Sequence, residues 1–122
     1  MKKTTEKKLE AVEMWFLRRM LRILWRERIT NEEVMRRAGV EKMLLKNIRK
    51  KQLNFLGHIL RAHGMERNCL LGRVEGTRSR GRQRIKYMDA LLSQLGDGWR
   101  MVDLVRLSEE RADWRSMVAS VN

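Results

Sequence analysis

The sequence predicts an all-α fold, a small domain of about five helices interrupted by one basic loop that could include a short hairpin. Apolar residues recur at helical spacing over most of the chain, except in residues 64–84, where this periodicity disappears. A length of 122 residues allows one domain with a modest core and is too short for two sizeable ones. We therefore expect a flexible basic N-terminus, residues 1–8, and a single helical domain, residues 9–122.

The first long helix is expected from about Glu6 to Arg28, a stretch without glycine or proline. Its apolar positions at helical spacing are Val12, Phe16, Met20, Ile23 and Leu24. On the other face, Arg18, Arg22 and Arg26 follow each other at intervals of four residues. Such a stripe could track phosphates or could simply be solvated.

A short helix should follow from Asn31 to Ala38. Thr30 with Glu33 three residues later has the form of a capping box, and Gly39 follows the last helical residue.

The second long helix is predicted from about Glu41 to Ala62, and it is the most basic helix of the chain. Its apolar side is opposed by basic residues that include Lys42, Lys46, Arg49 and Lys50. Gly57 lies inside this helix, where glycine costs about 1 kcal/mol relative to alanine. Because close approach of another backbone is the usual compensation, we predict a helix crossing at Gly57.

The basic loop lies in residues 64–84. Leu70–Val74 could form at most a short strand or hairpin arm that leads into the stretch Gly76–Arg84. Within that stretch arginine occupies every second position, at Arg78, Arg80, Arg82 and Arg84. Glycines and small hydroxyl residues leave the backbone loose, so that these arginines can turn outward and follow a line of negative charge. A phosphate backbone is the expected partner.

Helical spacing returns after the loop. One helix is expected over residues 85–95 and ends at Gly96-Asp97-Gly98, and a further segment covers residues 101–107. The last helix is expected to be capped by Ser108, with Glu109 and Glu110 in a first turn that suits the helix dipole.

The net charge of +13 is unevenly distributed. Residues 1–86 hold 24 Lys and Arg against 9 Glu, whereas residues 87–122 hold 4 Arg against 6 acidic residues. Such a surface predicts a nucleic-acid partner first and an anionic membrane second. The plain alternative is a merely solvated surface, because charge determines association rather than fold.

The single cysteine, Cys69, excludes an intramolecular disulfide and fits a reducing compartment. No apolar run approaches the roughly 20 residues that a membrane span needs. We therefore expect a nuclear or cytoplasmic protein that does not enter a membrane.

No motif predicts catalysis, a metal or a cofactor. Tyr87-Met88-Asp89-Ala90 is similar to the Tyr-x-Asp-Asp turn of polymerases, but the second carboxylate that two-metal catalysis needs is missing. His58, His63 and Cys69 match no common zinc spacing and lack a fourth ligand. The residues alone thus favour a protein that is not an enzyme.

Several stretches resemble, in the same order, the segment that follows the polymerase domain in reverse transcriptases of non-long-terminal-repeat (LINE-type, RTE- or jockey-like) retrotransposons. They are Leu9–Trp25, Thr30–Val34, Arg49–Arg61 with its Gly-His pair, the arginine stretch Gly76–Arg84, and Glu110–Arg115. The resemblance implies a detached C-terminal piece that would help to hold template RNA or target DNA.

The departures from that family concern single residues and whole domains. Gln83 stands where many relatives have proline, and Leu24 where they often have proline or serine, and neither change removes a charge. The endonuclease and polymerase domains have no counterpart in this sequence.

The sequence therefore predicts non-catalytic binding of RNA or DNA through backbone contacts with weak sequence specificity. Two alternatives stay open. One is a protein-interaction module whose apolar face around Trp15, Trp25 and Phe55 docks on a partner, and the other is a remnant reading frame without a selected function.

Overall fold

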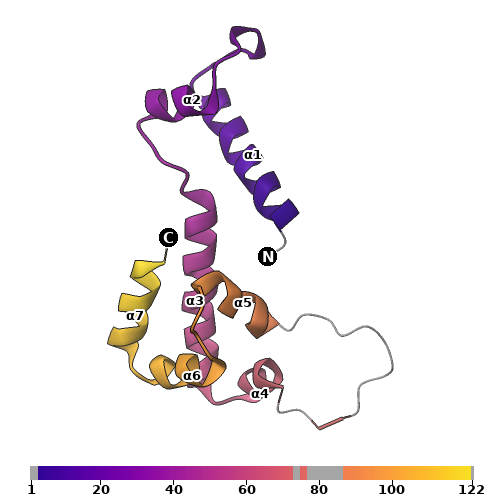
Figure 1. Cartoon of the computed structure of the whole chain (residues 1–122), viewed down its shortest axis with the longest axis vertical. Coiled ribbons are helices and arrows are strands. Elements are labelled where there is room, and N and C mark those ends of the chain that lie inside the picture. Colours follow the sequence, from indigo (N-terminus) through magenta and orange to yellow (C-terminus); the bar gives the residue numbers. More distant parts are fainter. Residues whose placement is uncertain (1–2, 73–74, 77–86, 122) are drawn as a thin grey trace. The chain divides into compact units, whose positions relative to one another are not determined.

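The computed structural model describes residues 3–72, 75–76 and 87–121, and in this part of the chain it is all-helical, as predicted. Its elements are α1 (Lys3–Met20), the short 3-10 helix η1 (Trp25–Glu27), α2 (Asn31–Ala38), α3 (Leu44–Ala62), α4 (Met65–Leu71), α5 (Tyr87–Leu95), α6 (Met101–Glu109) and α7 (Arg111–Ser120) (Figure 1). The chain divides into two compact units, residues 1–49 and 50–122, and each is described by itself. The single domain expected for residues 9–122 stays a prediction.

The first helix differs from its predicted bounds at both ends. Residues 3–8, expected to be flexible, already belong to α1, and the helix ends at Met20 rather than Arg28. Arg22 adopts a left-handed backbone with φ of 54°. Its N–H bonds the carbonyl of Arg19 at 3.2 Å, and the N–H of Ile23 bonds that of Arg18 at 3.0 Å. These two bonds form a Schellman-type helix ending, in which the left-handed position is usually occupied by glycine. Because arginine occupies it here, no glycine in the sequence marks the end of α1.

The second helix has the predicted bounds, the Thr30 cap and the Gly39 ending. Only the Thr30 half of the expected capping box forms, because the Glu33 carboxylate bonds Arg36 and Arg37 instead. The Thr30 hydroxyl accepts a hydrogen bond from the N–H of Glu33 at 3.4 Å, and Gly39 ends α2 in the left-handed conformation with φ of 65°. Both signals are local, because each cap lies within a few residues of the backbone groups that it satisfies.

Helices α1 and α2 pack on each other, and each contains one buried apolar residue, Met14 and Val34 (Figure 1). The guanidinium of Arg18 adds a polar link, donating to the backbone carbonyl of Ile29 at 2.7 Å and to Asn31 Oδ1 at 2.9 Å. Arg18 therefore joins α1 to the start of α2.

The start of α3 depends on a residue of α1. Glu13 Oε1 accepts hydrogen bonds from the backbone N–H groups of Met43 at 2.8 Å and Leu44 at 3.0 Å. A carboxylate from a distant helix thus satisfies donors that a local cap would otherwise take. The sequence placed this start at Glu41 because it offered no sign of the distant cap.

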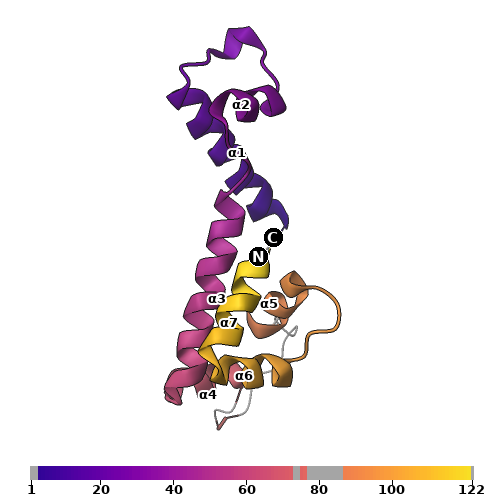
Figure 2. The same ribbon diagram turned by 90° about the vertical axis from the view of Figure 1, so that its left-hand side faces the viewer.

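The core of the second unit is formed by α3, α5, α6 and α7. Its buried residues are Leu53, Leu56, Leu60, Met88, Leu91, Leu104, Trp114, Met117 and Val118. Helix α7 runs alongside α3 in both views (Figures 1 and 2). The predicted close approach at Gly57 is present, but the neighbour is the indole of Trp114 rather than a backbone.

The remaining differences concern residues 64–84 and the last helix. Residues 65–71, expected in the loop or in a short strand, form α4, which ends at Gly72 with φ of 69°. Ser108, predicted to cap the last helix, is instead buried inside α6, and its hydroxyl donates to the carbonyl of Val105 at 2.6 Å. Helix α7 begins after Glu110.

Candidate nucleic-acid interface

The four arginines of the predicted loop, Arg78, Arg80, Arg82 and Arg84, lie outside the residues that the structure describes. Their contacts with phosphate stay a prediction. The other candidates lie on described elements and fall into two groups, one on α3 with the residues just before it and one at the end of α1.

The basic row that begins just before α3 is engaged within the first unit by acidic residues of α1. Lys42 Nζ lies 3.7 Å from Glu10 Oε2. Arg49 Nη2 lies 3.0 Å from Glu6 Oε1, and both of these side chains are largely buried. The predicted row is therefore partly neutralised by α1, which lowers its attraction for an external anion.

The other two members of this row are half-buried. Lys46 belongs to the first unit. Lys50 belongs to the second unit, where its Nζ donates to the backbone carbonyl of Ala119 at 3.3 Å.

The predicted stripe of Arg18, Arg22 and Arg26 does not exist as one helix face. Arg18 is tied to the start of α2. Arg22 follows the end of α1, and Arg26 belongs to η1, with its guanidinium carbon 5.9 Å from the centre of the Trp25 ring. The stripe was wrong because it assumed eight more residues of helix, on the order of two turns.

Arg22 and Arg26 instead share an exposed loop with Trp25. We call residues 21–29 the Trp25 loop. Trp25 is 83% exposed, and Arg22, Arg26 and Arg28 are exposed as well. Arg28, which the sequence-based selection missed, has a left-handed backbone with φ of 48°. The sequence feature that could have indicated Arg28 is the run of basic residues on both sides of Trp25.

The Trp25 loop is held in shape by its own backbone and by Glu27. The Glu27 carboxylate accepts a hydrogen bond from the N–H of Leu24 at 2.9 Å, and the N–H of Arg28 bonds the carbonyl of Trp25 at 3.4 Å. The arginines and the indole are thus presented from a turn rather than from an unstructured segment. Such an arrangement offers a planar ring for stacking and cations for phosphates.

Large apolar side chains are exposed over the same unit. Trp15 and Phe16 contact each other edge to face, with ring centres 5.1 Å apart, and both are more than half exposed. Val12, Met20, Leu21 and Leu24 are exposed too. This exposure supports the alternative of a protein partner, since large apolar patches mark interaction surfaces.

The acidic residue Glu33 of α2 is committed to its own helix. Its carboxylate accepts hydrogen bonds from Arg36 at 2.8 Å and from Arg37 at 2.9 Å. These bonds lower the pKa of Glu33 from 4.5 to about 2, with Arg36 contributing most. The same pairing raises the pKa of Arg36. Both arginines are therefore partly neutralised.

The residues considered for catalysis or metal binding lie apart. Asp89 is exposed on α5, and Cys69 is exposed on α4. His63 Nδ1 contacts the guanidinium of Arg67. Among the described residues, no group of three or more His, Cys, Asp or Glu side chains could hold a metal ion.

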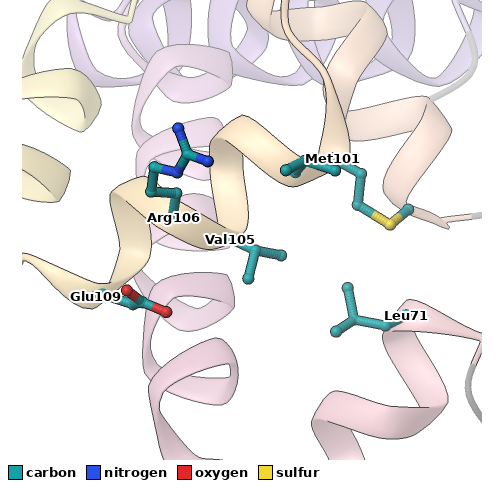
Figure 3. Close-up of a pocket in the computed structure, with 6 residues that line it drawn as sticks. Leu71, Met101, Val105, Arg106 and Glu109 are labelled. Carbon is teal, nitrogen blue, oxygen red and sulfur yellow. The ribbon is translucent and has the colours of Figure 1, made fainter.

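An apolar pocket of about 300 Å³ lies between α4 and α6 in the second unit (Figure 3). Leu71 of α4 and Met101 and Val105 of α6 point toward this space, with Arg106 and Glu109 at its edge. A mainly apolar lining with one acid and one base offers no selectivity for a polyanion, so we do not include it in the interface.

Comparison of the chain with models of protein families, with curated proteins and with solved structures found no match. Within the described part of the chain, no helix is both long and apolar enough to cross a membrane.

Proposed function

We propose that this chain binds RNA or DNA through phosphate contacts and base stacking, without catalysis of its own. The resemblance to the post-polymerase segment of LINE-type reverse transcriptases supports this function. The observation that carries it is the Trp25 loop, which combines three exposed arginines with an exposed indole on a chain of net charge +13.

Four acidic residues of the first unit are engaged away from this loop, and the loop's own acid, Glu27, accepts a hydrogen bond from the N–H of Leu24. Glu6, Glu10 and Glu13 are engaged by α3 or by the residues that precede it. Glu33 is paired within α2. Within the described part of the chain, Arg22, Arg26 and Arg28 form no salt bridge, so their charges are available to an approaching polyanion.

Stacking explains why a tryptophan would be exposed between cations. Each base that stacks on an aromatic side chain contributes about 1–3 kcal/mol, with little dependence on sequence. The arginines contribute a salt-dependent term, about −0.7 in the slope of log K against log salt for each phosphate contact on a single strand. The two terms can be measured separately because only one depends on salt.

The test is a binding titration against single- and double-stranded RNA and DNA at several salt concentrations. Replacing Arg22, Arg26 and Arg28 by alanine should flatten the single-strand salt slope by about two units. Trp25→Ala should weaken single-strand binding about five- to 150-fold at every salt concentration, leaving the slope unchanged.

Two variants serve as matched controls. Lys3→Ala, Lys7→Ala and Lys8→Ala together remove the same charge from exposed positions of α1, and Trp15→Ala removes another exposed tryptophan. In both control variants, the salt slope and the affinity for single strands should change less than in the loop variants. Equal losses in the control and loop variants would place the contacts elsewhere.

A protein partner is the alternative that the exposed Trp15 and Phe16 favour. Association through this face would persist at high salt, whereas charge-driven complexes with nucleic acid dissociate there. Size-exclusion chromatography at high salt therefore distinguishes a protein partner from a nucleic-acid partner. A stable protein complex that is lost in Trp15→Ala, with no nucleic-acid binding at any salt concentration, would replace the proposed function.

A further inference from the structure

A second basic feature lies in the second unit, between α3 and α7. It is a pocket of about 280 Å³ lined by Asn54, His58, Arg61, Arg111, Trp114 and Arg115. None of these residues was selected from the sequence as a binding residue. His58 and Arg61 are three positions apart on α3, and Arg111 and Arg115 are four apart on α7, so each pair shares one helix face.

The pocket gathers positive charge without a carboxylate in its lining. Within the described part of the chain, Arg61, Arg111 and Arg115 form no ion pair. The nearest acids along α7, Glu110 and Asp113, are exposed and do not line the pocket. Three guanidinium groups around one space repel each other unless an anion lies between them, so the lining selects for negative charge.

Trp114 joins the two helices that line the pocket. Trp114 is 1% exposed, its Nε1 donates to the backbone carbonyl of Leu53 at 3.1 Å, and its indole lies against Gly57. These contacts place α7 on α3 and thereby set the position of Arg111 and Arg115 relative to Arg61. Because α3 and α7 already pack together, an anion would bind without the entropic cost of bringing them together, which favours affinity.

Arg61 is anchored on one side and has donors left over. Its Nη1 donates to the backbone carbonyl of Ser108 at 3.0 Å, whereas its buried Nε has no hydrogen-bond partner among the described residues. A guanidinium carries five N–H donors, so three remain for a ligand once the bonded one on Nη1 and the buried one on Nε are left out. A phosphate group matches such forked donors and presents several acceptor oxygens.

We propose that this pocket binds a phosphate group, held by Arg61, Arg111 and Arg115 with His58 and Asn54 at its side. The phosphate belongs either to a nucleic-acid strand, in which case the inference rests on the proposed function, or to a free phosphate or nucleotide. The chemistry of recognition is the same for both sources.

The experiment follows the arginine Nε–Hε signals by NMR while inorganic phosphate is added to the whole chain at constant ionic strength, with chloride as the reference anion. We expect saturable shifts in the signals of the pocket arginines. The variant Arg111→Gln with Arg115→Gln should weaken phosphate binding at least about tenfold, because two charge-assisted hydrogen bonds are lost. Both positions are exposed, so the fold should be retained.

The matched control is Arg100→Gln with Arg106→Gln, which removes the same charge from exposed residues outside the pocket. It should bind phosphate like the unmodified chain. Shifts that do not saturate, or equal weakening in the pocket and control variants, would overturn the proposal.

A second titration distinguishes the two sources with oligonucleotides that end in a 5′-phosphate or a 5′-hydroxyl. A nucleic-acid source predicts that the pocket variant loses affinity for the strands more than the control does. Phosphate binding without nucleic-acid binding would leave the pocket assigned to a free phosphate and refute the proposed function. Strand binding through the Trp25 loop, with no phosphate binding in the pocket, would refute the pocket and retain the function.

Discussion

The indole of Trp114 lies so close to Gly57 that a β-carbon built at Gly57 would be 2.4 Å from Nε1. The same Nε1 donates its hydrogen bond to Leu53, one turn earlier on α3. A residue at the middle of one helix thus contacts the backbone of another, and the only side chain that allows this at position 57 is hydrogen. The contact places α7, and with it Arg111 and Arg115, against α3.

Gly57→Ala should lower the free energy of unfolding by about 1–3 kcal/mol, because the added methyl group would displace the buried indole from its hydrogen bond with Leu53. On an exposed helix position the same change would raise stability by about 1 kcal/mol, so the sign is diagnostic. Urea unfolding followed by tryptophan fluorescence measures it.

Two comparisons make this test specific. Lys51→Ala, at an exposed position of α3, should change stability by less than about 0.5 kcal/mol. In a Trp114→Phe background, which removes the indole nitrogen, Gly57→Ala should cost less than in the unmodified chain. Additive effects of the two substitutions would show that the indole is not the obstacle.

Glu13→Ala should destabilise the start of α3 by about 0.5–2 kcal/mol, the range for loss of a helix cap. The reason is that two backbone N–H groups, of Met43 and Leu44, lose their acceptor. Hydrogen exchange at these two amides reports the loss directly. Glu10→Ala is the control, because its exposed pair with Lys42 at 3.7 Å contributes at most about 1 kcal/mol. Similar exchange rates in both variants would contradict the capping role.

The carboxyl group of Glu33 should titrate near pH 2 in an NMR pH titration. Because its pKa is lower in the folded chain than the ordinary 4.5, its contribution to stability is present above pH 4.5 and is lost as the pH falls toward 2. Arg36→Gln should raise this pKa more than Arg37→Gln does, since the bond from Arg36 is the larger cause. If neither substitution changes the titration midpoint of Glu33, its carboxylate does not pair with these arginines in solution.

Replacing Arg78, Arg80, Arg82 and Arg84 by alanine should flatten the slope of log K against log salt for duplex DNA by about three units. The reason is that each phosphate contact contributes about −0.9 to that slope. Affinity should fall for all sequences alike, because phosphate contacts carry no base information. Thermal stability should barely change. An unchanged slope here, with a flattened slope in the Trp25 loop variant, would leave the phosphate contacts to the Trp25 loop alone.

The purified chain should show no polymerase or endonuclease activity with Mg²⁺ or Mn²⁺, since the sequence lacks the paired carboxylates of two-metal catalysis. A chelator should likewise leave helicity and the thermal midpoint unchanged. Primer extension that survives repurification and disappears in Asp89→Ala would contradict the first expectation, and stoichiometric zinc by elemental analysis the second.

Local signals in the sequence determined the all-α class and the whole of α2. Thr30 and Gly39 act on backbone groups a few residues away, so their effect can be read without knowing what else is nearby. The need for a close neighbour at Gly57 could also be predicted, because glycine is unfavourable inside a helix. The excess of positive charge, and with it the expectation of a polyanionic partner, follows from composition alone.

Only the tertiary structure decided where α1 ends, where α3 begins and which basic residues remain available. Arg22 adopts a backbone conformation usually left to glycine, and Glu13 caps a helix 30 residues later in the chain. The pocket arginines come from helices about 50 positions apart and meet because Trp114 packs on Gly57. Such features depend on contacts between distant segments, and periodicity along the chain contains no information about which segments those are.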